Sequence, residues 1–335
     1  MHEIPDSFCL LPGALLYAVV DMTQGRTTIF LIRHGARHDY NNPEGWKEQC
    51  TRLGLERLDP PLSALGHEQG REVAAALKDE PITHLLASPY LRVLQTAQPL
   101  AQALGKPLCV EHGLAEFKHH PARIAPHLGV RVAVIPEVDD QYESSFPANN
   151  FVLDAGGQEP VVEYLRRILF VARALPQRHG GTTIACFSHA ASVALVAALT
   201  NRTSLLDDEG LTFAPCGIYK LVSNDGGATW ALERSGARNE GHISANDPTT
   251  YSWGFQHSSG AARHEEDWKR ALSLGPTCGA CAGPSAKGGA PPLETTHVQQ
   301  LQAADRDRVA GKAFLLGVAC GVVASAALAL KLRRR

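Results

Sequence analysis

The sequence predicts an α/β protein with three layers, in which helices cover both faces of a mainly parallel central sheet. Apolar, strand-like segments alternate with segments of helical periodicity from Thr27 onward. The intervening segments are long enough for the crossovers that parallel strands require. With 335 residues, 44% hydrophobic and 20% charged, the chain can form one large core with appendages or two smaller domains.

The first half of the expected sheet contains three strands and two helices. Ser63 suits the N-cap of the first helix, whereas Ser88 and Pro89 suit the cap and the first helical position of the second. The expected strands span residues 27–32, 82–88 and 107–111, and the helices span residues 62–78 and 89–104.

The second half continues the alternation and then ends in a hairpin. We expect helices at 159–175 and 190–199 and a strand at 182–188. The segments "GIYKLVS" and "TWALERS" then read as two strands joined by the turn "NDGGA".

Other stretches lack this periodicity and suggest a division of the chain. The segment 118–150 is weakly periodic and rich in His, Pro and acidic residues, and "MHEIPDSF" lacks the basic start of a secretory signal. A short amphipathic helix is compatible with "EEDWKRAL" in an otherwise low-complexity stretch. The expected parts are an N-terminal extension (1–25), a main α/β domain (26–246) with an insertion (118–150), a linker (247–312) and a membrane span (313–332).

Residues Ala313–Leu330 are uncharged and are followed by "KLRRR". As a helix, this run would reach ~27 Å, close to the thickness of a hydrocarbon core. We expect a single-pass tail anchor with the main α/β domain in the cytosol. A short anchor with a basic end favours the mitochondrial outer membrane or the peroxisome over the secretory pathway. The alternative is a buried Ala-rich helix. Gly317 and Gly321 have GxxxG spacing, which would allow a homodimer.

Charge and cysteine content limit the classes of partner. A net charge of −2 gives no electrostatic reason to expect nucleic-acid binding. The eight cysteines are scattered without a disulfide framework, which indicates a reducing compartment. Cys278 and Cys281 form a lone CxxC without a second pair, so we expect no metal and no cofactor.

Chemically active side chains follow several of the expected strands. In open parallel sheets, ligands bind beyond the carboxyl ends of the strands. Each residue alone also fits a structural or solvated role, but together they predict an anion site with one carboxylate. The cluster comprises Arg33, His34, Gly35 and Arg37 after the first strand, Arg92 in a first helical turn, Glu116 on a loop, and His189 at another strand-to-helix junction.

The motifs around these residues resemble the histidine phosphatase (phosphoglycerate-mutase-like) superfamily. They occur in the expected order as "LIRHGAR", "DPPLSALGHEQG", "HLLASPYLRVLQTAQPLA", "VEHGLAEF" and "FSHAASV", with a weaker "RNEGHI". Within the superfamily, "RHGAR", "IPEVDDQYESSFP" and "VVEYLRR" look most similar to the phosphatase domain of the suppressor-of-T-cell-receptor-signalling proteins.

The resemblance implies a phosphatase that acts through a phosphohistidine. His34 would be the nucleophile, neutral at the attacking nitrogen because a hydrogen bond on the other nitrogen fixes the tautomer. Arg33 and Arg92 would clamp the phosphoryl oxygens, and His189 would donate to the same oxygens. Such a cluster supplies the positioning and charge that phosphoryl transfer needs.

Three further residues receive roles from the same resemblance. Glu116 would protonate the leaving oxygen, provided that burial offsets the effect of nearby cations on its pKa. Arg37 and Gly35 would contact the substrate, a phosphorylated small molecule or a phosphoprotein. Three residues that could line the substrate entrance fit a solvated loop better, namely Asp39, Tyr40 and Trp46.

Two alternatives to a phosphatase remain open. A membrane-anchored adaptor would bind a phosphorylated partner without catalysis, but every core catalytic position is filled. A phosphoglycerate-type mutase is disfavoured because Arg37 occupies the position where those enzymes carry a small hydroxyl residue, and because "FKHHP" follows Glu116. Replacement of His34 or Glu116 should be tolerated by an adaptor but not by an enzyme.

Overall fold

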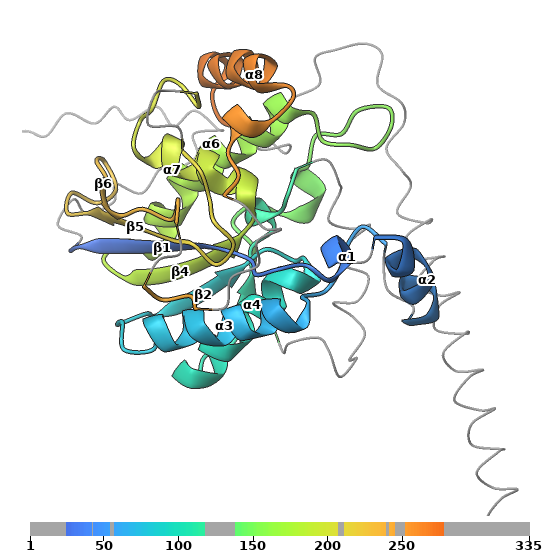
Figure 1. Ribbon diagram of the computed structural model, residues 1–335. Coiled ribbons are helices and arrows are strands. Elements are labelled where there is room, and N and C mark those ends of the chain that lie inside the picture. Colours follow the sequence, from blue (N-terminus) through green and yellow to red (C-terminus); the bar gives the residue numbers. More distant parts are fainter. Residues whose placement is uncertain are drawn as a thin grey trace, which may run out of the picture. The chain divides into compact units, whose positions relative to one another are not determined.

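The computed structural model describes only part of the chain, shown as coloured ribbon in Figure 1. The chain divides into two compact units, 1–282 and 283–335, and every described residue belongs to the first unit. The described residues are 25–41, 43–53, 57–117, 138–206, 211–238, 241–244 and 252–277.

A six-stranded sheet with the order β3-β2-β4-β1-β5-β6 forms the centre of this unit. The first four strands in that order are parallel, whereas β5 is antiparallel to β1 and β6 is antiparallel to β5. The expected α/β fold with a mainly parallel central sheet is confirmed, and the two strands expected around the turn "NDGGA" pair with each other. The strands are β1 (Thr27–Arg33), β2 (His84–Ala87), β3 (Leu108–Val110), β4 (Thr183–Ser188), β5 (Ile218–Ser223) and β6 (Ala231–Arg234).

Helices lie on both faces of the sheet (Figure 1). The α-helices are α1 (His38–Asn41), α2 (Pro43–Leu53), α3 (Ala64–Leu77), α4 (Leu91–Leu104), α6 (Val161–His179), α7 (Val193–Leu199) and α8 (Ala261–Leu274). The short 3-10 helices are η1 (His112–Leu114), η3 (Ala148–Asn150), η4 (Ala190–Ser192) and η5 (Phe255–His257).

Alternate residues of β1 belong to two separate cores. Ile29 and Leu31 pack with residues of α6 and α7, whereas Phe30 and Ile32 pack with residues of α3 and α4. All four side chains are at most 1% exposed. This alternation follows from the two-residue period of a strand and places β1 in the middle of three layers.

The segment after β1 is helical, in contrast to the solvated loop expected there. Trp46 on α2 is only 4% exposed, and its indole Nε1 donates to the carbonyl of Arg57 at 2.8 Å. Tyr40 on α1 is 47% exposed, so only part of the segment faces solvent. α1 has only four residues and α2 is mostly polar, so the hydrophobic pattern that would reveal them in the sequence is weak.

The packed structure reaches past residue 246, where the sequence analysis ended the domain. Trp268 on α8 is completely buried and donates from Nε1 to the carbonyl of Arg202 at 3.3 Å, and Phe255 on η5 is also buried. Because α8 is highly charged and contains a single buried aromatic residue, the sequence analysis placed it in the linker. The rest of the expected linker, residues 278–312 with Cys278 and Cys281, lies outside the described residues.

Other expected segments are described in part or not at all. Val138, from the end of the expected insertion, pairs with Leu108 on the edge strand β3. Residues 118–137, the first 24 residues and the expected membrane span at 313–332 lie outside the described residues. None of the helices in the described ranges combines the length and apolar character needed to cross a bilayer.

Candidate active site

His34 follows β1 directly and lies at the carboxyl end of the parallel strands. Its backbone N–H donates to the carbonyl of Ser188 at 3.0 Å, which continues the pairing of β1 with β4. Its Nδ1 lies 2.8 Å from the carbonyl oxygen of Gly35, an acceptor, so Nδ1 carries the proton and the lone pair is on Nε2. Burial, together with the nearby Arg92 and Arg33, lowers the pKa of His34 well below its usual value, and the imidazole is neutral.

Two buried guanidinium groups flank His34. Arg33 donates from Nη1 to the carbonyl of Phe213 at 2.5 Å, and burial lowers its pKa to about 10. Arg92 occupies the first turn of α4, where Asp59 lies 3.5 Å from its Nη1. Both side chains are at most 6% exposed. An anion in this place would meet two cations whose planar guanidinium groups match the geometry of a phosphate.

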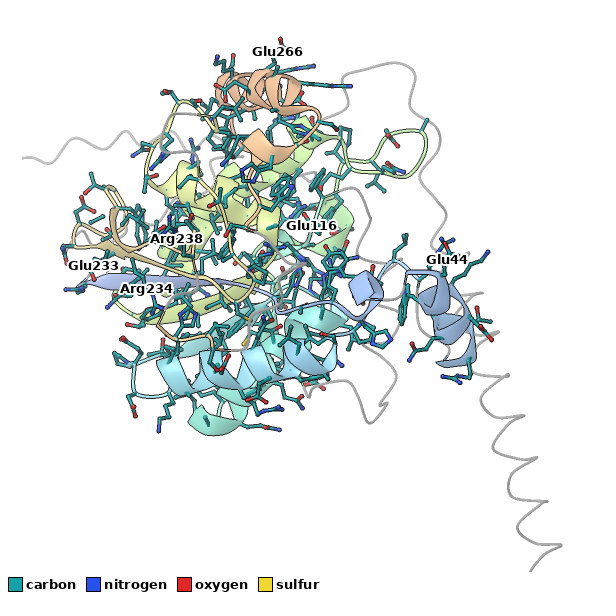
Figure 2. All side chains as sticks on the ribbon, viewed as in Figure 1. Glu44, Glu116, Glu233, Arg234, Arg238 and Glu266 are labelled. Carbon is teal, nitrogen blue, oxygen red and sulfur yellow. The ribbon has the colours of Figure 1, made fainter. Side chains whose placement is uncertain are left out.

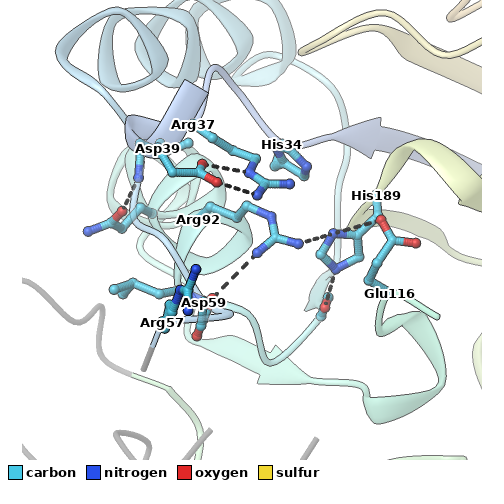
Figure 3. Close-up of polar contacts among 12 residues, drawn as sticks. His34, Arg37, Asp39, Arg57, Asp59, Arg92, Glu116 and His189 are labelled. Carbon is cyan, nitrogen blue, oxygen red and sulfur yellow. Dashed lines mark hydrogen bonds and ion pairs between the residues drawn. The ribbon is translucent and has the colours of Figure 1, made fainter. Parts of the chain in front are cut away.

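His189 lies opposite His34, with their ring centroids 5.4 Å apart in a T-shaped arrangement. Its Nε2 is 2.7 Å from the hydroxyl of Ser88, and its Nδ1 accepts from Arg92 at 3.2 Å (Figure 3). Burial and the charge of Arg92 hold its pKa well below the usual value. His189 is therefore neutral, and Nδ1 must gain a proton, or the tautomer must change, before that atom can donate to a phosphoryl oxygen.

Glu116 brings a carboxyl group to the same cluster. One of its oxygens lies 3.8 Å from Nδ1 of His189, and its side chain is 23% exposed. Burial raises the pKa of Glu116 even though Arg92 opposes this shift, as the sequence analysis required of a proton donor. Figure 2 shows the contrast with Glu44 and Glu266, exposed carboxylates that point outward from α2 and α8.

Gly35 has a packing reason for its identity. A Cβ at this position would lie 2.8 Å from the carbonyl oxygen of Gly66, closer than side chains tolerate. Its N–H donates to the hydroxyl of Thr96 at 3.1 Å, and its carbonyl fixes the tautomer of His34. Gly35 thus permits the close approach of the strand end to α3, whereas a substrate contact for it stays a prediction.

Arg37 lies beside the cluster and is paired within its own segment. Its guanidinium makes a bidentate contact with Asp39, at 3.0 and 2.7 Å, and stacks on the ring of Tyr40 at 4.4 Å (Figure 3). This contact raises the pKa of Arg37. A substrate that uses Arg37 must share it with Asp39, or displace Asp39.

The sequence profile of the histidine phosphatase superfamily (branch 1) matches residues 29–236. The chain belongs to this superfamily. The match begins within β1, ends just after β6 and includes each residue of the cluster described above. The family resemblance inferred from the motifs is thereby confirmed.

Several proteins are similar to this chain over part of its length. The human ubiquitin-associated and SH3 domain-containing protein A is 26% identical over 205 residues, which are 49% of this chain and 31% of the relative. This match supports the resemblance to the suppressor-of-T-cell-receptor-signalling type. The transcription factor tau 55 kDa subunit of Saccharomyces cerevisiae is 36% identical over 94 residues, 27% of this chain and 20% of the relative.

A probable phosphoglycerate mutase, GpmB of Enterobacter sp., is 33% identical over 89 residues, 27% of this chain and 37% of the relative. The chain therefore spans 20% to 37% of the length of these curated relatives. Among solved structures, the ecdysone phosphate phosphatase from Bombix mori in complex with tungstate aligns with a TM-score of 0.45 and 21% identity, covering 66% of this chain and 97% of that one.

Arg167 on α6 is a residue to which the sequence analysis assigned no role. Its completely buried guanidinium donates to the carbonyls of Gly113 at 2.6 Å and Ala115 at 3.1 Å, next to Glu116. A bidentate contact with Glu159, at 2.8 and 2.6 Å, neutralises its charge. The motif "VVEYLRR" contains Arg167, but only the fold shows that this arginine holds the loop that carries Glu116.

Glu111 is a second residue that the sequence analysis did not assign. Its carboxylate is completely buried at the end of β3 and accepts from the backbone N–H groups of Gly113, Ser145 and Phe146 at 3.0, 2.7 and 3.1 Å. The hydroxyl of Ser144 donates to it as well, at 2.6 Å. Glu111 therefore ties the segment 138–150 to η1, which precedes Glu116.

Asp59 completes the support of the cation cluster. Both of its oxygens accept from the backbone N–H of Leu91, at 3.0 and 3.1 Å, and it lies near the guanidinium of Arg92 (Figure 3). It thus caps the start of α4 and holds the cation of that turn. Its position in "DPPLS" identified it only as part of a family motif.

Proposed function

We propose that this protein is a phosphatase that hydrolyses a phosphomonoester through a phosphohistidine intermediate. The observation that carries the proposal is the state of His34: a neutral imidazole whose Nδ1 is bonded to the carbonyl of Gly35 and whose Nε2 has the lone pair, between two buried guanidinium groups. A neutral nucleophile among cations suits attack on an anionic phosphorus centre.

In the first step, Nε2 of His34 attacks the phosphorus and the bond from phosphorus to the leaving oxygen breaks. Arg33 and Arg92 take up the charge on the phosphoryl oxygens, which positioned guanidinium groups do without reorganisation. The protonated carboxyl of Glu116 gives its proton to the leaving oxygen, so the alcohol departs neutral. The raised pKa of Glu116 increases the fraction that holds this proton.

In the second step, water attacks the phosphohistidine. The Glu116 carboxylate left by the first step takes a proton from the water, while the bond between phosphorus and Nε2 breaks and its electron pair returns to the imidazole. Inorganic phosphate leaves, and both side chains regain their starting states. The cycle requires no atom beyond the substrate, water and the residues named.

Hydrolysis of an aryl phosphate by the full chain, in the presence of a chelator, tests the proposal. His34→Ala should lower kcat/KM by several orders of magnitude because no covalent intermediate can form. His38→Ala is the matched control, since His38 lies on α1 and its Nε2 contacts Gln49 at 2.6 Å, outside the cluster. An alkaline quench followed by mass spectrometry should find one phosphoryl group on His34.

Two results would overturn the phosphatase proposal. One is equal activity in the wild type and in His34→Ala. The other is inertness of the wild type towards aryl phosphate, phosphopeptides and phosphorylated metabolites alike. An inert wild type that still binds a phosphopeptide would favour the adaptor, whose partner is a phosphorylated protein.

We further propose that residues 313–332 tether the enzyme to a membrane facing the cytosol, with the mitochondrial outer membrane or the peroxisome favoured. The support is the uncharged run Ala313–Leu330 and the basic residues after it. A fluorescent reporter fused to the N-terminus should mark an organelle surface in the full chain and become diffuse when 313–335 are deleted. Diffuse signal from the full chain would refute the tether, and with it dimerisation through the GxxxG spacing.

A further inference from the structure

Tyr90 lies between two parts of the cluster, in a position that the sequence analysis did not single out. It is the residue before α4, with extended backbone angles (φ −68°, ψ 135°). Its carbonyl accepts from the N–H groups of Val93 and Leu94 at 2.9 and 3.1 Å, which closes the first turn of the helix. Its side chain is only 1% exposed, so the ring is held within the protein.

The ring of Tyr90 contacts both a cation and an imidazole of the cluster. The guanidinium carbon of Arg92 lies 4.4 Å from the ring centroid, within the range of a cation–π contact. The ring of His189 packs against the same tyrosine at a centroid distance of 4.7 Å and an angle of 74°. Because all three groups are buried, little water screens these contacts.

The hydroxyl of Tyr90 differs from the ring in its contacts. It is buried and has no hydrogen-bond partner among the residues that the structure describes. Burial also raises the pKa of this phenol above its usual value, so the group is neutral. An unpaired buried hydroxyl costs stability, and a phenylalanine would avoid that cost. The contacts that tie this residue to the site are therefore those of its ring.

We propose that Tyr90 is a positioning residue for phosphoryl transfer, whose ring holds the guanidinium of Arg92 and the imidazole of His189 in the orientation that binds the phosphoryl group. The inference rests on the proposed function. Arg92 spans Asp59 and His189 with its two terminal nitrogens, and a planar ring beneath it restricts its rotation. The imidazole of His189 packs edge-on against the same ring, and this packing keeps its Nε2 directed at Ser88.

The test compares Tyr90→Phe, which keeps the ring, with Tyr90→Met and Tyr90→Leu, which remove it. Binding of inorganic phosphate to the full chain is measured by calorimetry, alongside KM and kcat for an aryl phosphate. Met and Leu should weaken phosphate binding about tenfold and raise KM, because the cation–π contact is lost in a desolvated place. Phe should bind phosphate as the wild type does, with equal or higher thermal stability.

The dissociation constant separates positioning from a merely structural role. A variant that only unfolds in part binds less phosphate per mole of protein, but the folded fraction binds with unchanged affinity. Phe30→Leu is the matched control, since Phe30 is a 1% exposed aromatic of the same core. It should lower stability without changing the phosphate affinity of the folded protein.

The outcomes test the inference about Tyr90 separately from the proposed phosphatase function. Wild-type phosphate affinity in both Tyr90→Met and Tyr90→Leu would overturn the inference and leave the phosphatase intact. Loss of affinity in Tyr90→Phe would show that the hydroxyl, and not the ring, acts in the site, which also overturns it. A wild type that neither binds phosphate nor hydrolyses the substrate would overturn the proposed function and the inference with it.

Discussion

The two sides of the candidate active site are built in different ways. On one side, Arg33, His34 and His189 come from the ends of the neighbouring strands β1 and β4. On the other side, Glu116 follows η1 on a loop held by Arg167 from α6 and by the buried Glu111. Backbone ladders place the first set, and buried ionic side chains place the second. Phosphoryl binding should therefore resist distant substitutions, whereas proton transfer should be sensitive to them.

The largest effect is expected when Glu116, on the loop side of the site, is replaced by a residue that cannot donate a proton. Glu116→Gln keeps the shape of the side chain but cannot protonate a leaving oxygen, so kcat/KM for an alkyl phosphate should fall by about 10² to 10⁴. The loss should be much smaller for an aryl phosphate whose leaving group needs no proton. Phosphate affinity should stay within a few-fold of wild type, since the strand side is unchanged.

Steady-state kinetics with the two substrates check this prediction. Glu163→Gln makes the same chemical change on α6, where Glu163 pairs with Arg166 at 3.0 Å away from the cluster, and should leave both rates unchanged. Equal losses on alkyl and aryl phosphates would contradict the assignment of Glu116 as the proton donor.

The same contrast explains how much of the site the sequence could predict. Arg33, His34 and His189 follow apolar strands, and the carboxyl ends of parallel strands meet at one edge, so periodicity and topology brought them together. Arg167 lies in the middle of a regular helix, where nothing in the local pattern separates a buried arginine from a solvated one. Glu111 likewise acts through backbone groups of the segment 138–150, which only the fold brings near.

The same reasoning explains the limits of the fold prediction. Long periodic elements such as α3, α4 and α6 were expected close to their observed bounds, whereas the four-residue α1 and the mostly polar α2 were read as loop. α8 was underrated because only two of its residues, Trp268 and Ala271, are buried against the rest of the unit. Tertiary burial, and not local pattern, decides whether so polar a helix belongs to the domain.

A second test removes the support of the loop and leaves its carboxyl group in place. Arg167→Met should lower the free energy of unfolding by about 3–5 kcal/mol, because Glu159 would remain buried without its partner. The double variant Arg167→Met/Glu159→Leu should regain most of that stability. In both variants kcat on alkyl phosphates should fall at least tenfold, since the carbonyls of Gly113 and Ala115 lose their donor, whereas phosphate affinity should not change.

Chemical denaturation and calorimetry measure these two quantities separately. If the double variant recovered its kcat together with its stability, Arg167 would contribute to folding alone, and the proposed division between the two sides would be wrong.

A smaller effect is expected at Glu111. Glu111→Gln turns one acceptor oxygen into a donor, which would face the N–H of Ser145 or that of Gly113 and Phe146. We expect a loss of about 1–3 kcal/mol in unfolding free energy and a decrease of a few-fold in kcat. Ser144→Ala is the milder control, because it removes one donor and leaves the carboxylate its backbone partners. Larger damage from Ser144→Ala than from Glu111→Gln would contradict this ranking.

The smallest effect is expected from a change of pH, because the pKa values of His34 and Glu116 are shifted in opposite directions. Burial and nearby cations lower the pKa of His34 well below its usual 6.5, so the nucleophile stays neutral into the acid range. Burial raises the pKa of Glu116 above its usual 4.5, so the carboxyl keeps its proton to a higher pH than an exposed glutamate does. The first step needs a neutral His34 and a protonated Glu116, and both conditions hold together only between these two pKa values.

We therefore expect kcat/KM for an alkyl phosphate to be highest at mildly acidic pH and to fall as the pH rises through the pKa of Glu116. Glu116→Gln should abolish this alkaline decrease and leave a low, flat profile, whereas Arg167→Met should move the decrease to lower pH, because a loosened loop exposes the carboxyl group to water. The free energy of unfolding, in contrast to the activity, should decrease as the pH falls below 6.5. His34 and His189 are buried as neutral rings, so the unfolded chain binds their protons more readily than the folded chain does. An alkaline decrease that persists in Glu116→Gln would place the titrating group on the strand side and reverse the assignment.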